Sequence, residues 1–564
     1  MNHYKWNLLP SVPVEHPVTE STLPPLIIQL LYNRGIIEES DIDLFINADS
    51  RLSHDPYLLP DIHPAIARIY RALLSAETIA VYGDFDVDGI SGAALLTQGL
   101  SALGACVITY IPHRTKEGHG LNFAALGKLQ QQGASLVITV DCGITGIDAV
   151  KKANNISLDI IITDHHMPLD ELPPAIAVID PKRADSNYPF ADFAGVGVGF
   201  KLLQALYKSM DKEDQLARFF DLVSLGTVAD MMPMLGENRY LVRQGLELLN
   251  TSPRLGIRQI SSLANLNIGS LGAEDISWTL APRLNAAGRL ENAMTSYNLL
   301  TTDNADEAYK LALQLEETNT ERQKLTSLAL SKARQQVLGK GISPLLLTCD
   351  CDYPGGVLGL IAGKLSCEFY RPSIAVRIGD RYSSASCRSI PEFDIIQAIS
   401  SCSDLLTRFG GHAQAAGFTL STENLPHLEL QLRRLAASRL DGLDLRPHLD
   451  IDAEVMLDDF TGNTFNAIQL LAPFGKGNQF PIFLSRSVKV ADCQLMGNNG
   501  DHLRLKLKQN GILWDAVAFG LGDRLSKMQP VIDIVYNIEL NRWGGEERLR
   551  LNILDMADEN QVLG

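Results

Sequence analysis

Three aspartates occupy alternate positions in the segment VYGDFDVDG, at Asp84, Asp86 and Asp88. They follow a short apolar stretch, residues 78–82, that is typical of a buried strand. Carboxylates this close repel one another unless cations bind between them. A single aspartate would be enough to cap the helix predicted over ISGAALLTQGL. Three aspartates instead indicate a site for hard divalent cations such as magnesium or manganese.

Two other predicted strands end in groups of the same kind. LVITVD ends at Asp141, and IIITD ends at Asp164, which His165 and His166 follow directly. Each group alone is weak evidence, because a lone aspartate at a strand end is usually a cap and an Asp–His pair is often a satisfied polar contact. Parallel sheets, however, bind ligands at the carboxyl ends of their strands. Together the three strand ends predict a metal-dependent phosphoryl-transfer site.

Further polar residues could complete such a site. Asp230 in SLGTVAD is a candidate for the ligand shell, whereas Asp221 lies in the helix-like FFDLVSLG and is more typical of a structural residue. Glycines allow a backbone to approach a ligand closely, and arginine with serine can cradle a phosphate. A tight turn or surface ion pairs would explain the same residues without a ligand. The candidates for substrate binding are His412 in RFGGHAQAAGF, Ser386, Arg388 and Ser389 in SASCRS, and Arg283, Asn285 and Arg289 in PRLNAAGR.

The composition limits the class of protein. The chain has 564 residues, 46% of them hydrophobic and 20% charged, which is typical of a globular protein with several domains. We find no apolar run of the roughly 18 residues that a membrane span needs and no secretory signal. The eight cysteines are scattered, which predicts reduced thiols and a cytoplasmic protein. A net charge of −17 argues against a general nucleic-acid coat but not against a nucleic-acid enzyme.

The order of elements predicts a multi-domain α/β protein. Short Val- and Ile-rich strands alternate with helical stretches over 75–235, which is typical of a doubly wound parallel sheet. A long polar helix over 302–340 is either a bridge between lobes or an ordinary packed helix. Alternating strands after residue 450 indicate a small β-barrel, of which the oligonucleotide-binding (OB) type is one candidate. In HLRLKLK, three cations share one strand face that either binds nucleic acid or is merely solvated, namely Arg504, Lys506 and Lys508.

The motifs VYGDFDVDG, ITVDCGIT, TDHH, SLGTVAD, PRLNAAGR and FGGHAQAAG, in this order, resemble those of the DHH–DHHA1 phosphoesterases. With the C-terminal barrel, the chain resembles the branch of that family that digests single-stranded DNA, from about residue 50 onward. The resemblance implies a lead-in over 1–55, a parallel-sheet DHH domain over 56–300, a connecting helix over 301–342, a smaller α/β DHHA1 domain over 343–445 and an OB-type β-barrel over 446–564.

The resemblance also implies an activity. It implies a metal-dependent exonuclease of DNA repair and recombination that degrades single-stranded DNA 5′ to 3′ to mononucleotides with two manganese or magnesium ions. Single-stranded DNA and a single-strand-binding protein would be its partners, and we expect a monomer without membrane contact. The alternative is a phosphodiesterase for short RNA or cyclic dinucleotides, whose relatives usually lack the C-terminal β-rich segment. A non-catalytic replication scaffold should have lost ligands, and a metal-binding regulatory module would bind metal without turnover.

The resemblance assigns roles to the candidate residues. His166 would contact the scissile phosphate, next to Asp164, and His412 would reach the substrate from the second lobe. The metals would be held by Asp84 or Asp86, Asp88, Asp141, His165 and Asp230. The terminal phosphate would be gripped by Arg114, Arg283 or Arg289, Ser386 and Arg388.

Two segments depart from the family pattern. Tyr353 and Pro354 stand where the family usually has a Trp–His pair, so one substrate contact would be missing. Cys387 interrupts a segment that is usually Gly-Ser-Gly-Arg-Ser, and we expect its side chain to narrow the phosphate pocket. Neither change touches the predicted metal ligands.

Overall fold

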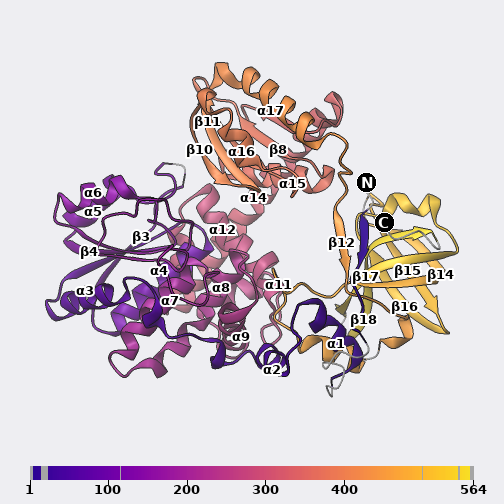
Figure 1. Ribbon diagram of the computed structural model, residues 1–564, viewed down its shortest axis with the longest axis horizontal. Coiled ribbons are helices and arrows are strands. Elements are labelled where there is room, and N and C mark those ends of the chain that lie inside the picture. Colours follow the sequence, from indigo (N-terminus) through magenta and orange to yellow (C-terminus); the bar gives the residue numbers. More distant parts are fainter. Residues whose placement is uncertain are drawn as a thin grey trace.

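The chain forms three lobes, which Figure 1 shows in the order of the sequence. The structure is a computed structural model, and it describes residues 4–13, 23–114, 116–460, 462–497, 499–543 and 546–558. We call residues 56–304, coloured purple to pink, the first lobe, the orange residues 341–445 the second lobe and the yellow part after residue 446 the barrel lobe. The predicted architecture of a parallel-sheet lobe, a smaller α/β lobe, a long connecting helix and a C-terminal β-barrel is confirmed. Within the described ranges, every helix is too short or too polar to span a lipid bilayer.

The first lobe is built on a five-stranded parallel sheet with the strand order β3-β2-β4-β5-β6. The strands are short and buried, and parallel neighbours need helical crossovers between them. Their bounds are β2 Thr78–Gly83, β3 Cys106–Tyr110, β4 Ala134–Val140, β5 Asp159–Thr163 and β6 Ala177–Ile179.

Helices cover both faces of this sheet, because alternate residues of each strand point to opposite sides. Ile79 and Val81 of β2 join the core under one helical layer, whereas Ala80 and Tyr82 join the core under the other. In Figure 1, α3, α4 and α7 lie below the sheet and α5 and α6 lie above it. The bounds are α3 Ile62–Leu74, α4 Val87–Ala102, α5 Phe123–Gln131, α6 Ile147–Asn154 and α7 Gly195–Lys208.

A helical region completes the first lobe and leads into the long helix α14, Ala305–Lys340. Ala312 and Leu315 pack in the core of the first lobe, and Ala333 and Val337 pack with the second lobe. The helix therefore bridges the two lobes, which decides between the two interpretations of its sequence. The helices before it are α8 Phe220–Ala229, α9 Gly236–Thr251, α10 Leu255–Leu263, α11 Ala273–Asp275, the π-helical turn η5 Ile276–Leu280, α12 Ala281–Leu290 and α13 Met294–Thr301.

The second lobe has a mixed five-stranded sheet with the order β10-β11-β9-β8-β7. Only β7 and β8 pair in parallel, and the other neighbours are antiparallel. The bounds are β7 Leu346–Asp350, α15 Leu358–Phe369, β8 Ser373–Arg377, β9 Tyr382–Arg388, α16 Ile395–Ser400, β10 Leu406–His412, β11 Ala415–Ser421 and α17 Leu425–Leu440.

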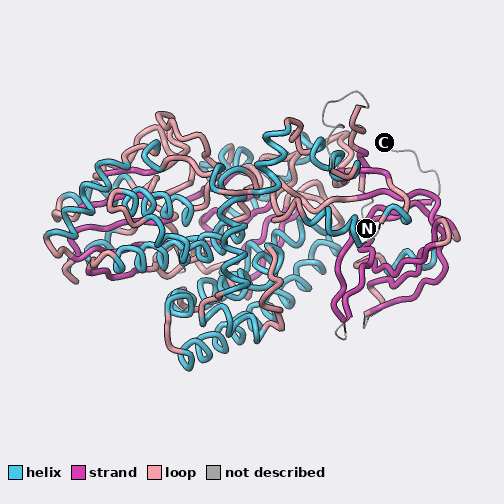
Figure 2. Tube along the Cα trace, turned by 90° about the horizontal axis from the view of Figure 1, so that it is seen from below, coloured by secondary structure: helices cyan, strands magenta, loops and turns pink. Residues whose placement is uncertain are grey.

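The barrel lobe is a six-stranded sheet that closes because β14 pairs with both β15 and β17. Figure 2 shows its strands as a magenta ring. Arg504, Lys506 and Lys508 are exposed on one face of β15, as their spacing predicts, but Lys506 lies between Asp492 and Asp515 on the neighbouring strands. The bounds are β12 His448–Ile451, β13 Ala453–Glu454, α18 Gly462–Gln469, β14 Phe483–Met496, β15 His502–Gln509, β16 Ile512–Ala518, β17 Val531–Trp543 and β18 Glu546–Asp558.

The N-terminal segment packs on the barrel lobe. Its strand β1, Lys5–Leu8, pairs in parallel with β12. Its helices α1, Pro25–Asn33, and α2, Glu39–Asn47, bury Leu30 and Phe45 in the core of the barrel. The lead-in predicted from the sequence thus contributes to the fold of a region more than 400 positions away.

Arg239 of α9 connects the first lobe to this assembly. Its guanidinium is fully buried over the ring of Phe45, at 3.7 Å from the ring centroid. It donates hydrogen bonds to the backbone oxygen of Phe45 at 2.7 Å and to that of Ala472 at 2.8 Å. One side chain therefore satisfies carbonyls from the N-terminal segment and from the segment that enters the barrel.

Replacing Arg239 with Met should lower the unfolding temperature measured by calorimetry. Two buried carbonyls would lose their donor, at a cost of roughly 2–4 kcal/mol. The matched control is Arg243→Met, one turn later on the same helix, where an exposed guanidinium donates to the backbone oxygen of Ile46. We expect that variant to change the stability by no more than about 0.5 kcal/mol. Equal stability of the two variants would contradict the connecting role of Arg239.

Candidate metal and phosphate site

Four aspartates stand in one row along the carboxyl edge of the parallel sheet. Gly83, Val140, Thr163 and Ile179 are register partners on adjacent strands, and an aspartate follows each of them. The backbone pairing extends to the row, because the amide of Asp141 donates to Thr163 and that of Asp164 donates to Ile179, both at 3.1 Å. The members of the row are Asp84, Asp141, Asp164 and Asp180.

Two more aspartates belong to the turn and first residues of α4. Asp86 is the N-cap of α4 and accepts hydrogen bonds from the amides of Asp88 and Gly89. Asp88 accepts from the amides of Gly195 at 2.6 Å and Val196 at 2.8 Å, at the start of α7. Asp86 is therefore a helix cap, as one interpretation of the sequence proposed. The N-terminus of α7 fixes the position of the Asp88 carboxylate.

The start of α7 also presses against Asp141. A Cβ atom on Gly195 would lie 2.4 Å from the Cβ of Asp141, so only glycine fits there. Asp141 itself has φ of 63°, in the left-handed region that a residue with a side chain rarely adopts. Such strained backbone is found at functional sites, where the surrounding structure holds it.

Carboxylates and imidazoles converge at this edge in three overlapping groups whose ligand atoms lie within 4.8 Å of one another. Asp141 belongs to two of the groups, and His165 also belongs to two. This overlap is what a pair of cations sharing a ligand requires. The groups are Asp84 with Asp86 and Asp141, Asp88 with His165 and Asp230, and Asp141 with His165 and His166.

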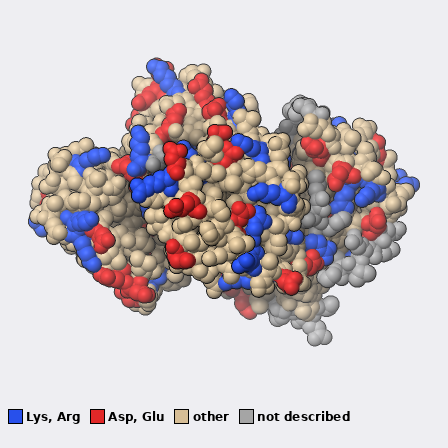
Figure 3. All heavy atoms as spheres, turned by 90° about the horizontal axis from the view of Figure 1, so that it is seen from above, with Lys and Arg blue, Asp and Glu red and all other residues tan. Residues whose placement is uncertain are grey.

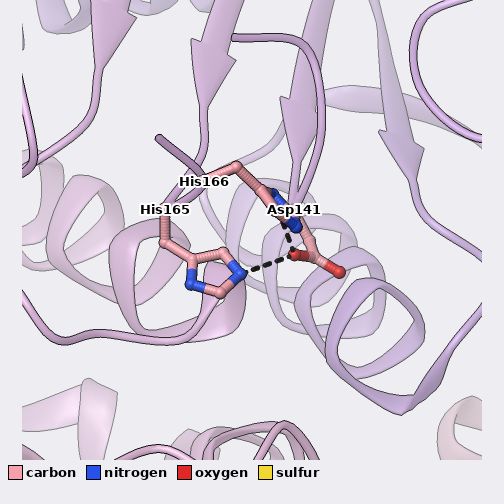
Figure 4. A group of neighbouring side chains, drawn as sticks. All are labelled: Asp141, His165 and His166. Carbon is pink, nitrogen blue, oxygen red and sulfur yellow. Dashed lines mark ion pairs between the residues drawn. The ribbon is translucent and has the colours of Figure 1, made fainter. Parts of the chain in front are cut away.

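The imidazole of His165 tests whether divalent cations fit these groups. Its buried Nε2 lies 3.1 Å from Asp141 and 3.6 Å from Asp230, yet it makes no hydrogen bond. Oxygens of Asp84 and Asp230 are likewise buried without a partner. Figure 4 shows both histidines turned toward the same carboxylate oxygen of Asp141. Unpartnered carboxylate oxygens suit magnesium or manganese, and manganese also accepts an imidazole nitrogen such as that of His165.

Crowding of the acids changes their protonation. Burial and the neighbouring Asp230 and Asp86 carboxylates hold the pKa of Asp88 well above its usual range. Burial and the charges of Asp88 and Asp86 do the same to the pKa of Asp141. Burial and Asp86 raise the pKa of Asp230 to about 7. A divalent cation would relieve this repulsion and favour the ionised forms.

The two histidines differ in protonation. Burial and the charge of His166 lower the pKa of His165 to about 3, so its imidazole is neutral and able to bind a metal. Burial opposes the charged form of His166 as well, but the hydrogen bond from its Nδ1 to Asp164 at 2.8 Å raises its pKa to about 9. His166 is half-exposed. A cationic donor, held in one orientation by Asp164, therefore faces the acidic edge.

Asp164 orients the two histidines and does not belong to the metal-binding groups. It accepts from the amides of Ile144, His165 and His166 as well as from the His166 ring. Burial opposes the ionised form of Asp164, yet the His166 hydrogen bond and charge hold its pKa below the ordinary value. Its oxygens are occupied by donors, which suits an anchor for His166.

Three arginines gather beside Asp86, where the first and second lobes meet. Arg289 donates to the backbone oxygen of Gly356 in the second lobe. Burial and the charges of Arg114 and Arg322 lower the pKa of Arg289 to about 10. Burial also lowers the pKa of Arg114, and the charge of Arg388 from the second lobe acts in the same direction. Buried cations that repel one another indicate an anion site.

The second lobe adds Ser386 and Arg388 to this arginine cluster. A Cβ on Gly359, in the first turn of α15, would lie 3.2 Å from the Ser386 hydroxyl and 3.4 Å from the Arg388 guanidinium. A helix N-terminus next to them favours an anion further. On the first-lobe side, the Asn285 carboxamide accepts from the amide of Val87, so it braces the aspartate turn.

The remaining candidates lie elsewhere. Arg283 forms an ion pair with Glu316 of α14 at 2.5 Å, and the Ser389 hydroxyl donates to the backbone of Phe393. Among the described residues, the groups around Asp141 do not include His412, which is exposed at the end of β10. Asp221 is buried and paired with Arg254, as expected of a structural residue.

The two departures from the family pattern place their side chains in hydrophobic cores of the second lobe. The expectation that Cys387 narrows the phosphate pocket is wrong. Ser386 and Arg388 face the arginine cluster, whereas Cys387 points to the opposite side of β9 and is fully buried in the core of the second lobe. Tyr353 is also buried, in the core between α14 and α15.

Two residues at the site were not anticipated. Asp180 is the fourth member of the aspartate row, and burial raises its pKa to about 7. In the sequence AVIDP, Asp180 directly follows an apolar strand, as the other three aspartates do. This position at a strand end is the signal from which it could be predicted. His119 lies 3.5 Å from Asp84 and packs on Phe85 from a loop with no regular pattern.

Comparisons with known proteins agree with this geometry. Models of the DHH family N-terminal domain, the DHHA1 domain and the RecJ OB domain match residues 78–227, 341–437 and 451–555. The single-stranded-DNA-specific exonuclease RecJ of Bacillus subtilis is 35% identical over 540 residues, covering 95% of this chain and 68% of that protein. The protein of the same name in Haemophilus influenzae is 30% identical, covering 93% and 95%.

Solved structures are similar over the whole chain. The crystal structure of RecJ in complex with Mn²⁺ from Thermus thermophilus superposes with a TM-score of 0.86 at 28% identity, covering 100% of this chain and 80% of that one. The Mg²⁺ complex from the same organism gives a TM-score of 0.80 at 26% identity, covering 100% and 79%. This chain and the Thermus thermophilus protein therefore share the same overall fold.

Replacing Gly195 with Ala should weaken metal binding. The added Cβ would displace Asp141 and the amide that supports Asp88, and such supporting contacts typically contribute roughly 10–100-fold to metal affinity. Titration of the metal-free protein with Mn²⁺ by calorimetry measures this. The control is Gly127→Ala in α5, where nothing lies within 4 Å and stability should rise by up to about 1 kcal/mol. An unchanged affinity in Gly195→Ala would show that the close approach is unimportant.

Binding of Mn²⁺ should release protons, most strongly near pH 6 and less toward pH 8. The pKa of Asp230, about 7, means that this carboxyl is protonated below neutral pH, and a cation must displace the proton. The pKa values of Asp88 and Asp141 are raised in the same direction. The apparent affinity should therefore fall as the pH falls. Calorimetry in two buffers of different ionisation enthalpy counts the protons. A count of zero at the lower pH would contradict the crowded, protonated site.

Proposed function

Because this chain belongs to the RecJ family of single-stranded-DNA-specific exonucleases, we propose that it removes nucleotides from the 5′ end of single-stranded DNA. The observation that carries the proposal is the buried His165 Nε2, which makes no hydrogen bond although carboxylates of Asp88, Asp141 and Asp230 lie close to it. Hydrolysis of a phosphodiester by two cations needs such a cluster.

The residues present fit two divalent cations, manganese or magnesium. One would be held by Asp84, Asp86 and Asp141, and the other by Asp88, His165 and Asp230, with Asp141 between them. When bound, these ions lower the pKa of water and supply a hydroxide nucleophile near neutral pH. The strained backbone of Asp141 and the helix N-terminus at Asp88 keep the ligands in position.

His166 and Asp164 act as a pair on the scissile phosphate. Asp164 fixes the His166 ring through Nδ1, so Nε2 is available to donate to a non-bridging oxygen. Charge that develops on that oxygen in the transition state is stabilised by a donor already in place. The pKa of about 9 keeps His166 protonated over the neutral range.

The arginine cluster binds the 5′-terminal phosphate. Arg114 and Arg289 come from the first lobe, and Ser386 and Arg388 come from the second, so the terminal phosphate neutralises a group of mutually repelling cations. Its position beside Asp86 sets the distance from the strand end to the metals. Release of mononucleotides follows from this short distance.

The barrel lobe adds a surface for longer strands, which favours the exonuclease over a phosphodiesterase for short RNA or cyclic dinucleotides. The residues matched by the RecJ OB domain model include β15 with its exposed cations. Figure 3 shows basic and acidic side chains mixed over one face of the molecule, so binding there relies on local groups. A single-strand-binding protein as partner, a monomeric state and a cytoplasmic location stay predictions.

Digestion of a 3′-labelled single strand, with or without a 5′ phosphate, tests the proposal. With Mn²⁺, the wild-type protein should shorten the strand from its 5′ end and prefer the phosphorylated end. Arg388→Met should reduce this preference, because the terminal phosphate loses a charge-assisted contact. The control is Arg334→Met, which removes an exposed ion pair on α14. Asp141→Asn should abolish hydrolysis while the circular dichroism spectrum is retained.

Two results would contradict the proposal. Near-normal turnover by Asp141→Asn would refute the metal assignment. Efficient cleavage of cyclic dinucleotides with no attack on the long strand would favour the alternative substrate class.

A further inference from the structure

The turn at residues 474–478, with the sequence FGKGN, joins the barrel lobe to the metal centre. The backbone oxygen of Lys476 accepts from the amide of Met234 at 2.8 Å. A Cβ on Gly475 would lie 2.8 Å from the side chain of Met234, and Gly477, with φ of +76°, packs against Leu235. The turn therefore lies directly on the segment that follows the candidate metal ligand Asp230.

Hydrogen bonds to neighbouring backbone groups fix the conformation of this turn. The buried carboxamide of Asn478 donates to the backbone oxygens of Leu471 and Pro473, both at 2.8 Å. Arg239 donates to the neighbouring Ala472 at 2.8 Å. The docking contact of Lys476 is made by its backbone, and its side chain is exposed. The fold thus presents an ammonium group next to the acidic edge.

Lys182 is a second lysine close to the acidic edge. Its amide donates to Asp180, the last aspartate of the row, at 2.8 Å. Neither Lys182 nor Lys476 forms an ion pair with a carboxylate among the residues that the structure describes. Lys182 follows the last aspartate of the row by two residues, and the turn that carries Lys476 is docked on Met234 and Leu235, four and five residues after Asp230.

Cations from different segments therefore reach the acidic centre. Arg289 lies where the first lobe contacts Gly356 of the second lobe, whereas Lys182 belongs to the turn after Asp180 and Lys476 to the turn docked behind Asp230. Asp86 and Asp230 belong to different metal-binding groups. A strand whose terminal phosphate occupies the arginine cluster, and whose first phosphodiester lies at the metals, continues toward the lysines.

We propose that Lys476 and Lys182 bind a backbone phosphate on the 3′ side of the scissile bond, and so form a second phosphate-binding point for single-stranded DNA. This inference rests on the proposed function. It means that the turn at residues 474–478 contacts the substrate directly, next to the metal centre. A substrate of only two nucleotides would end before this point, whereas a longer strand would reach it.

Steady-state digestion of a 5′-phosphorylated single strand by Lys476→Ala, over a range of sodium chloride concentrations, tests the inference. We expect a higher KM, a retained kcat and a plot of log(1/KM) against log[salt] that is less steep by about 0.7 for the lost contact. Lys182→Ala should behave in the same way, and Lys476→Arg should restore the slope. The matched control is Lys151→Ala on the outer helix α6, which removes an exposed lysine paired with Glu171 and should keep the wild-type slope.

A dinucleotide substrate separates substrate binding from an effect on the metal ligand. If the lysines bind the strand, Lys476→Ala should cleave the dinucleotide as the wild type does. A fall in kcat on both substrates, or a changed Mn²⁺ affinity by calorimetry, would show that Lys476 acts through Asp230 and would overturn the inference. So would a wild-type salt slope in Lys476→Ala. A wild-type protein that does not digest single strands would instead overturn the proposed function, and this inference with it.

Discussion

Repulsion among carboxylates at one edge of a sheet is the constraint on which the rest of this structure depends. Parallel pairing in register places four aspartates side by side, and the turn before α4 adds two more. The folded chain must hold these carboxylates close together although burial and mutual repulsion raise the pKa values of Asp88 and Asp141. It does so with helix N-termini, with the glycine at position 195 and with the left-handed backbone of Asp141. Local strain is therefore located where the chemistry needs rigid ligands.

The positive groups of the site come from three separate parts of the chain. Arg114 and Arg289 belong to the first lobe and Arg388 belongs to the second, so the proposed phosphate site forms only where the lobes meet. Lys476 comes from the segment that enters the barrel. Helix α14 and the buried Arg239 fix these parts relative to one another. An overall acidic protein can in this way bind a polyanion through cations gathered at a few points.

Much of the site could be predicted from the sequence because strand ends are local signals. Asp141 and Asp164 each follow a short apolar run, and parallel pairing then brings them together without further information. Asp180 follows the same rule, because the apolar run before it also indicates a strand, so the sequence carried the signal although Asp180 is not among the predicted ligands. His119 and Lys476 could not be found, because each reaches the site through irregular backbone whose path depends on distant contacts. Cys387 was misjudged because the face of β9 that meets the core is set by its neighbours in the sheet.

The pairing of the N-terminal segment with the barrel has a consequence for how the protein forms in the cell. Trp6 donates to Asp555, 549 positions away, and α1 and α2 complete the barrel core. During synthesis on the ribosome, these residues emerge long before their partners, and their apolar faces stay exposed until the barrel strands have been made. The parallel sheet of the first lobe, in contrast, pairs strands that are all made early. We therefore expect the N-terminal segment to fold only after the barrel strands have been made, with chaperones shielding the N-terminal helices in the interval.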